Sequence, residues 1–120
     1  MAHILLAEDD QSMREFLARA LRRAGHVVED VGDGDAVLRL IKQAPDFDLL
    51  LADIVMPGVD GIELVQRVSG KHPDMKIMLI TGFAAVSVRA KETLGTKTKV
   101  LSKPFHLKDL IQEVETVLAA

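Results

Sequence analysis

The fold is decided by one stretch of the chain, FDLLLADIVMPGVDG, residues 47–61. It begins as an apolar run of strand length, and the carboxylate of Asp53 closes that run. A loop rich in Pro and Gly follows, from Ile54 to Gly61. Because a carboxylate at the end of a buried strand is costly to desolvate without a partner, Asp53 is the first candidate site residue.

Three other apolar runs end in polar residues in the same way. They are 4–7, followed by Glu8, Asp9 and Asp10; 77–80, followed by Thr81; and 100–102, followed by Lys103. In a parallel sheet covered by helices on both faces, ligands bind beyond the carboxyl ends of the strands. We therefore expect the four positions to meet at one edge, where they can hold a hard cation and a phosphoryl group.

Short apolar runs alternate with amphipathic ones along the chain. Strands are predicted near 3–8, 27–31, 47–52, 76–81 and 99–102, and helices near 11–24, 35–43, 61–70, 84–94 and 107–118. Five alternations predict an α/β fold with a doubly wound parallel sheet in one domain, 1–120. The runs at 4–7, 49–52 and 77–80 are expected to be central strands. The first helix is predicted to bury one stripe: Met13, Phe16, Leu17, Ala20, Leu21 and Ala24.

Composition argues against several classes of function. A net charge of −3 disfavours nonspecific nucleic-acid binding, and the absence of cysteine excludes disulfides and thiol chemistry. The four histidines show no zinc-ligand spacing and are assigned to surface or turn positions. No apolar stretch approaches the ~20 residues that span a bilayer, so the expected location is the cytoplasm.

Each candidate residue also has a simpler explanation. Asp53 could form a turn, Asp9 or Asp10 could cap the helix that follows, and Thr81 and Lys103 could serve solvated strand ends. Their shared placement at strand ends favours a common site instead. In such a site Mg²⁺ or Mn²⁺ would relieve the repulsion among the carboxylates, and an ionised Asp53 could attack a phosphoryl group. Thr81 and Lys103 would then stabilise the phosphoryl oxygens.

These motifs resemble the receiver domain of bacterial two-component response regulators. The matching residues are Glu8-Asp9, Asp53 with the loop up to Gly61, Thr81-Gly82 and Lys103-Pro104-Phe105. The resemblance covers the whole chain and implies a flavodoxin-like receiver fold with strand order 2-1-3-4-5 and five helices. It also implies that Asp53 accepts phosphate from a histidine kinase or histidine phosphotransfer protein. Such a protein is a signalling switch and not a conventional enzyme, although the receiver helps to catalyse its own phosphorylation and dephosphorylation.

The same resemblance implies further roles in the site. Glu8, Asp9, Asp53 and the backbone carbonyl of Val55 would surround Mg²⁺, while Thr81 and Lys103 would contact the phosphate. The Lys103–Pro104 peptide bond is expected to be cis. The chain departs from the family at Val100, where Tyr or Phe is usual. A switch would therefore use Thr81 and the loop and helix after it, with Phe83 as an alternative moving group.

A closer resemblance is to CpdR-type single-domain receivers. It is carried by LLAEDD (5–10), SMR (12–14) and ITGFAA (80–85). It implies a role in cell-cycle control in which the unphosphorylated form promotes delivery of substrates to the ClpXP protease, so ClpX is an expected partner. Output would then be protein binding, with neither DNA nor a membrane as partner. The expected surface lies on the fourth helix, fifth strand and fifth helix, where residues 84–108 hold one acidic residue, Glu92, and six basic residues: Arg89, Lys91, Lys97, Lys99, Lys103 and Lys108. Lys103 is expected to point into the site, and an ordinary solvated face explains the other five as well as a docking surface does.

Three alternatives remain at this stage. A phosphate shuttle in a relay would use the same residues but pass the phosphate to a second histidine protein. A Mg²⁺-dependent aspartyl phosphatase or phosphotransferase would usually need a second Asp two positions after the first, where this chain has Val55. A flavin-binding electron carrier would need a Ser/Thr-rich phosphate loop after the first strand and an aromatic residue to stack on the flavin, and the chain has no Trp or Tyr.

Overall fold

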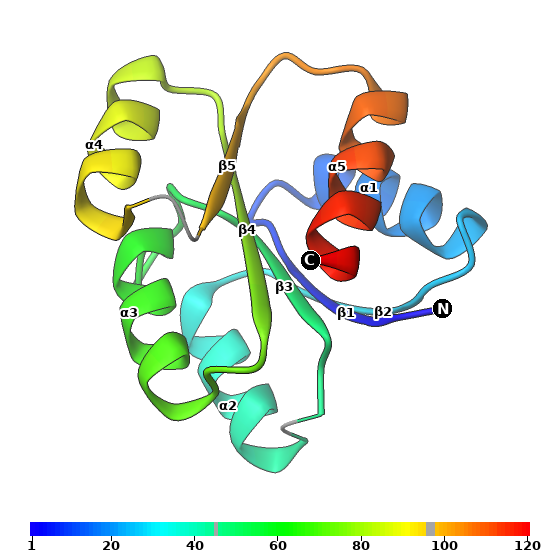
Figure 1. The fold of residues 1–120 in the computed structure, drawn as a ribbon, viewed down its shortest axis with the longest axis horizontal. Helices are drawn as coiled ribbons and strands as arrows, with labels where there is room; N and C mark the ends of the chain where they lie inside the picture. Colours follow the sequence, from blue (N-terminus) through cyan, green and yellow to red (C-terminus); the bar gives the residue numbers. More distant parts are fainter. Residues whose placement is uncertain (45, 96–97) are drawn as a thin grey trace.

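The computed structural model describes residues 1–44, 46–95 and 98–120. Five parallel strands form one sheet in the order β2-β1-β3-β4-β5, and helices cover both of its faces (Figure 1). The strands are β1 (His3–Ala7), β2 (Val27–Val31), β3 (Leu49–Asp53), β4 (Lys76–Thr81) and β5 (Lys99–Ser102). The helices are α1 (Gln11–Arg23), α2 (Gly34–Gln43), α3 (Gly61–Lys71), α4 (Ala84–Leu94) and α5 (Leu107–Ala119). The predicted fold class and strand order are confirmed.

The central strands β1, β3 and β4 are buried on both faces, as predicted. Their side chains alternate between two separate cores. In β1, Leu5 and Ala7 face the core beneath α2, α3 and α4, whereas Ile4 and Leu6 face the core beneath α1 and α5. Figure 1 shows these two groups of helices on opposite sides of the sheet. Since both faces are filled, the edge at the carboxyl ends of the strands is left for a site.

The stripe predicted for α1 is correct only in part. Leu17 and Leu21 are buried, and so is Ala18, which the pattern left out. Phe16 is 50% exposed and Ala24 is exposed. The sheet and α5 cover only part of the apolar stripe of α1. Phe16, Ala20 and Ala24 line a shallow groove between α1 and α5 instead.

One histidine lies deeper than expected. His26 occupies the turn between α1 and β2, but it is buried. Its Nδ1 accepts a hydrogen bond from the Ala2 N–H at 3.1 Å, and its Nε2 lies 2.7 Å from Glu115 Oε1 on α5. The turn could be predicted from the sequence, but the burial of His26 depends on partners from both ends of the chain.

Helix α4 is held to the body less firmly than the other helices. Its buried residues, Ser87 and Ala90, are both small, and Phe83 at its N-cap forms no side-chain hydrogen bond to the helix. By contrast, Asp10, Asp33 and Asp60 cap α1, α2 and α3. Val86 and Leu94 also pack against the core but are only partly buried, so no large side chain of α4 is fully buried, and we expect its rearrangement to cost less than that of its neighbours.

No helix in the described part of the chain is both long enough and apolar enough to cross a membrane.

The loop between β3 and α3 is shaped by two glycines. Gly58 has a φ of 76°, a left-handed conformation that residues with a side chain rarely adopt. Gly61 begins α3, and its N–H donates to the Ile54 carbonyl at 2.7 Å. A Cβ at Gly61 would lie 2.6 Å from the Ile54 Cα and 3.0 Å from the Asp53 carbonyl oxygen. The absence of a side chain therefore lets α3 start directly against the end of β3.

We predict that Gly61→Ala destabilises the protein by about 1–3 kcal/mol, because the new methyl group meets backbone atoms that cannot move independently. Gly70→Ala, in the same helix, is the matched control: no atom lies within 4 Å of its added Cβ, so helix propensity should make it neutral or more stable by up to about 1 kcal/mol. Urea unfolding followed by circular dichroism measures both changes. Wild-type stability of the Gly61 variant would contradict the proposed close approach.

Candidate functional site

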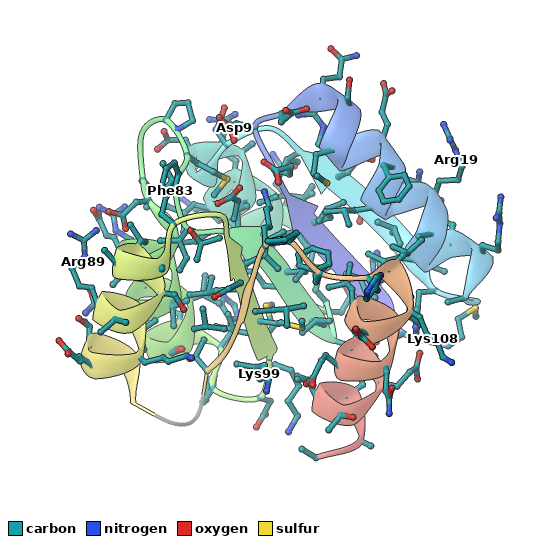
Figure 2. All side chains as sticks on the ribbon, turned by 90° about the horizontal axis from the view of Figure 1, so that it is seen from above. Asp9, Arg19, Phe83, Arg89, Lys99 and Lys108 are labelled. Carbon is teal, nitrogen blue, oxygen red and sulfur yellow. The ribbon has the colours of Figure 1, made fainter. Side chains whose placement is uncertain are left out.

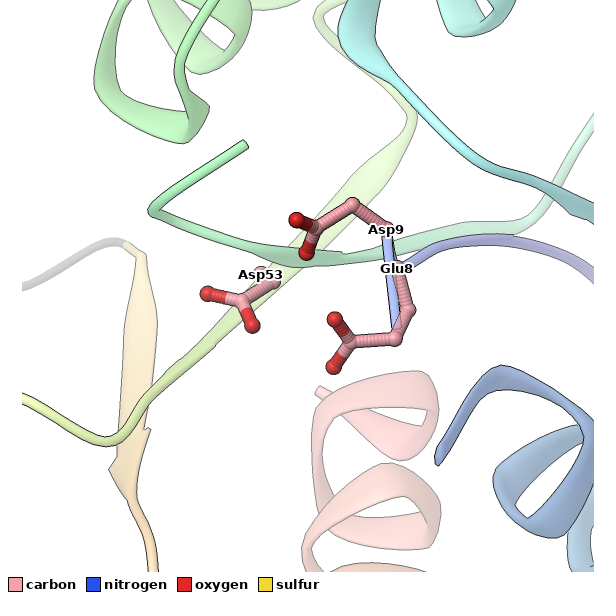
Figure 3. A group of neighbouring side chains, drawn as sticks. All are labelled: Glu8, Asp9 and Asp53. Carbon is pink, nitrogen blue, oxygen red and sulfur yellow. The ribbon is translucent and has the colours of Figure 1, made fainter. Parts of the chain in front are cut away.

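Three carboxylates meet at the carboxyl edge of the sheet. Glu8 and Asp9 directly follow β1, and Asp53 is the last residue of the neighbouring strand β3. One oxygen of each carboxylate lies within 4.8 Å of the others (Figure 3). Glu8 and Asp53 are buried, whereas Asp9 is exposed. We call this cluster of Glu8, Asp9 and Asp53 the acidic pocket; two of its members are buried and one faces solvent.

Lys103 brings a positive charge into this pocket. Its Nζ lies 3.2 Å from Glu8 Oε1 and 3.1 Å from Asp53 Oδ2. It directly follows β5, and the Lys103–Pro104 peptide bond is cis. Burial lowers the pKa of Lys103, but the charges and hydrogen bonds of Asp53 and Glu8 outweigh this effect and raise the pKa above 10.5. The side chain is therefore a permanent cation at neutral pH.

Asp53 is held at both of its carboxylate oxygens. Oδ1 accepts the Val55 N–H at 3.0 Å, and Oδ2 accepts a hydrogen bond from Lys103 Nζ. The side chain of Val55 itself points to solvent, with 45% of it exposed. Two hydrogen bonds therefore fix the orientation of the carboxylate in the site.

Thr81 ends β4, the strand beside Asp53, and is completely buried. Its Oγ1 accepts the Phe83 N–H at 3.2 Å, and its carbonyl accepts the Lys103 N–H at 2.7 Å. A hydroxyl that accepts one hydrogen bond still has its own O–H to donate. Thr81 therefore links the pocket to the residue that precedes α4.

The pKa of the Glu8 carboxyl is well above its ordinary value. Burial raises its pKa, and the nearby charge of Asp53 raises it further. Lys103 and the Asp10 N–H act in the opposite direction but offset only part of this effect, so the pKa is about 7 instead of 4.5. In the absence of another cation, Glu8 takes up a proton near neutral pH.

Of the two acids that could cap α1, Asp10 does so: its Oδ1 accepts the Met13 N–H at 3.0 Å. Asp9 is thus left to the acidic pocket. Arg14 was not among the predicted site residues, yet its Nη1 donates to the Glu8 carbonyl at 2.8 Å. No sequence signal marks this contact, because an Arg near the start of an amphipathic helix normally lies in solvent.

The basic residues of 84–108, which the sequence left open as either a docking surface or an ordinary solvated face, do not gather in one place. Arg89, Lys91, Lys99 and Lys108 are exposed, but Figure 2 shows Arg89, Lys99 and Lys108 spread around different sides of the molecule. Lys99 also pairs with Glu113 at 3.5 Å, and Lys103 faces the pocket. Lys97 lies outside the described residues.

The donor set of the pocket fits a hard divalent cation. Carboxylate oxygens are the ligands that Mg²⁺ and Mn²⁺ prefer, and an incomplete protein shell leaves coordination positions for water or a phosphoryl oxygen. The close approach of Glu8, Asp9 and Asp53 is the structural observation that supports this fit.

The raised pKa of Glu8 predicts how stability changes with pH. Its folded pKa exceeds the unfolded value, so the folded state binds more protons between these values, and the contribution of Glu8 is full below about pH 4.5 and lost by about pH 7. In a chelator, the free energy of unfolding should therefore fall from pH 5 to pH 8 by on the order of 1–3 kcal/mol, which urea titrations would measure. Glu8→Gln should remove this part of the slope, and an identical slope in that variant would refute the assignment.

Comparisons with known proteins place this chain in a family. The family model described as the response regulator receiver domain matches residues 4–115. The response regulator receiver protein CpdR of Brucella abortus is 51% identical over 120 residues, which cover 100% of this chain and 99% of that protein. The sensor kinase CckA of Brucella abortus is 31% identical over 118 residues, 98% of this chain but 12% of the kinase.

A solved structure shares the whole fold. The response regulator TrrA of Thermotoga maritima, solved in complex with Mg²⁺ and BeF, superimposes with a TM-score of 0.86 at 25% sequence identity, over 98% of this chain and 99% of that one. Fold, family match and whole-length similarity agree: the chain belongs to the response regulator receiver family of two-component signalling proteins.

Proposed function

We propose that this receiver is a phosphorylation switch in which Asp53 is the phosphoacceptor. The observation that carries the proposal is the position of Asp53: it closes β3 beside two other acids, with one oxygen held by the Val55 N–H and the other by Lys103. The phosphodonor is a phosphohistidine on a histidine kinase or a histidine phosphotransfer protein. The complex of TrrA with Mg²⁺ and BeF supports this assignment for a relative of the same fold.

The transfer step follows from the residues present. An oxygen of the ionised Asp53 forms a bond to phosphorus, and the bond between phosphorus and the histidine nitrogen breaks. The electron pair of that bond returns to the imidazole, which takes up a proton. Lys103 offers its ammonium to the transferred group, and Thr81 offers its O–H from the neighbouring strand end.

Glu8, Asp9, Asp53 and the carbonyl of Val55 would hold a divalent cation, Mg²⁺ or Mn²⁺. When bound, the cation supplies positive charge that offsets the charges of the carboxylates and the transferring oxygens. Lys103 contacts Glu8 and Asp53 in the structure, so it can neutralise part of the cluster before transfer and move toward the phosphoryl group afterwards.

Phosphorylation of Asp53 would change the surface of the protein through a rearrangement of α4. Val100 has no aromatic ring to move, so the route left to the chain is Thr81, whose hydroxyl bonds the Phe83 N–H just before α4. That helix is anchored by small residues, so a change at its N-terminus has little packing to overcome. Phosphorylation shifts the two-state equilibrium only by its differential contacts with the two states, and the Thr81 hydrogen bond is such a contact.

The output we propose is control of a partner protein, as in CpdR-type receivers. Identity of 51% over nearly the whole length of a CpdR supports this choice over a phosphate shuttle. The candidate partner is ClpX, bound by the unphosphorylated form to promote ClpXP proteolysis in the cell cycle. Equal affinity of both phosphoforms for ClpX, with rapid transfer of phosphate to a second histidine protein, would favour the shuttle.

Incubation with Mg²⁺ and a small phosphodonor such as phosphoramidate should add about 80 Da, the mass of one phosphoryl group, to the intact protein. Asp53→Ala and the isosteric Asp53→Asn should show no gain, and a chelator should abolish the gain in the wild type. Intact-mass spectrometry makes the measurement. An equal gain in both Asp53 variants would disprove the assignment of the phosphoacceptor.

Thr81→Ala should leave phosphorylation of Asp53 largely intact but suppress the response of α4, because the hydroxyl that connects the pocket to Phe83 is lost. The amide resonances of residues 84–94, followed by NMR before and after phosphorylation, report that response without a partner. Thr81→Ser keeps the hydroxyl and is the control that should respond like the wild type. A normal response of α4 in the alanine variant would rule out this route.

A further inference from the structure

The backbone that carries the acidic pair lies outside regular structure. β1 ends at Ala7, and α1 begins at Gln11. Glu8 is nevertheless held at every polar group: its N–H donates to the Val31 carbonyl at 3.1 Å, its Oε2 accepts the Asp10 N–H at 3.3 Å, and its Oε1 contacts Lys103. Its carbonyl accepts a hydrogen bond from a single side chain, that of Arg14.

Arg14 is itself fixed in place. It is the fourth residue of α1, and its side chain is only 21% exposed. Nη1 donates to the Glu8 carbonyl at 2.8 Å, and Nε lies 3.4 Å from Asp30 Oδ2 on β2. Asp30 is held in turn by Arg22, whose Nη2 lies 3.2 Å from Asp30 Oδ1 and donates to the Val28 carbonyl at 2.8 Å. The guanidinium therefore joins the loop after β1 to the edge strand.

The space around Arg14 also fits this role. A Cβ on Gly32 would lie 3.1 Å from Arg14 Nη1, so the guanidinium packs directly against the backbone that leaves β2. A planar side chain with donors on several nitrogens suits such a two-sided contact, whereas the ammonium of a lysine is a single point of charge.

Asp9 depends on this support more than Glu8 does. Within residues 1–44, 46–95 and 98–120, no side-chain hydrogen bond orients the Asp9 carboxylate, which is exposed yet lies within 4.8 Å of the Glu8 and Asp53 oxygens. Its direction is set by the peptide between Glu8 and Asp9, whose carbonyl is the group that Arg14 binds.

We propose that Arg14, anchored by Asp30, is a positioning residue of the acidic pocket: it fixes the Glu8–Asp9 peptide and thereby sets the affinity of the pocket for a divalent cation. The inference rests on the proposed cation site but adds a residue that does not itself touch the cation. Groups that orient metal ligands without touching the metal typically contribute a factor of ten to a hundred to the affinity for the metal.

The sign of the effect separates positioning from simple electrostatics. A nearby positive charge repels a cation, so removing it would tighten binding if charge were all that mattered. If Arg14 positions the ligands, Arg14→Met should weaken Mg²⁺ binding by about tenfold despite the loss of a positive charge. Arg14→Lys keeps the charge but cannot hold both Glu8 and Asp30, so it should also bind Mg²⁺ more weakly than the wild type.

The test is an NMR titration of the unphosphorylated protein with MgCl₂, which needs no kinase and no transfer step. Arg67→Met is the control for the loss of one positive charge, because Arg67 lies on the surface of α3 and pairs with Glu63. Asp30→Asn removes the anchor and should weaken binding in the same direction as the Arg14 variants. Glu29→Gln, one residue away on β2, controls for the loss of a negative charge and should have little effect.

A second readout uses no metal. In a chelator, the amide resonances of residues 8–10 should shift in both Arg14 variants and in Asp30→Asn, and stay near wild-type positions in Arg67→Met. If Arg14→Met does not fold, Arg14→Lys and Asp30→Asn decide the question. Mg²⁺ binding by either Arg14 variant as tight as that of the wild type overturns the positioning role alone. A wild-type protein that binds no Mg²⁺ would instead contradict the proposed function.

Discussion

The ammonium of Lys103 lies between two buried carboxylates, and the arrangement of the site depends on this contact. Glu8 and Asp53 come from neighbouring strands and would repel each other strongly without a cation between them. Burial adds a desolvation cost, which is why Glu8 titrates near neutral pH even with Lys103 beside it. The pocket could therefore exchange one positive partner for another, which is what the proposed binding of a divalent cation requires.

The rest of the fold serves to hold that unfavourable cluster together. Two cores on opposite faces fix β1, β3 and β4, so their carboxyl ends cannot separate. The loops beyond those ends are then secured locally, by Asp10 and Asp60 as helix caps, by Gly61 against Ile54, and by Arg14 on the carbonyl of Glu8. Helix α4 differs, since its fully buried residues are small and its N-cap residue forms no side-chain hydrogen bond to the helix.

Most of the strands and helices could be predicted from local sequence patterns. Apolar runs of strand length, each closed by a polar residue, predicted the strands, and the three-four spacing predicted the helices, because both signals depend on residues a few positions apart. The pattern was less reliable wherever burial depended on a distant partner. Phe16 fits the apolar stripe of α1 but lies half exposed at a groove, whereas His26 was assigned to a surface or turn position and is a turn residue that is buried against Ala2 and Glu115.

By itself, the sequence determined the order of strands and helices along the chain and the residues that close the strands. It also determined the chemistry that those closing residues offer. All three follow from residue type and local periodicity. Only the tertiary structure decided that Lys103 reaches Glu8 and Asp53, that Glu8 has a raised pKa, and that Arg14 and Asp30 support the acidic loop from behind. The reason is physical: distances and desolvation depend on which strand ends become neighbours, and that choice is made by packing across the whole sheet.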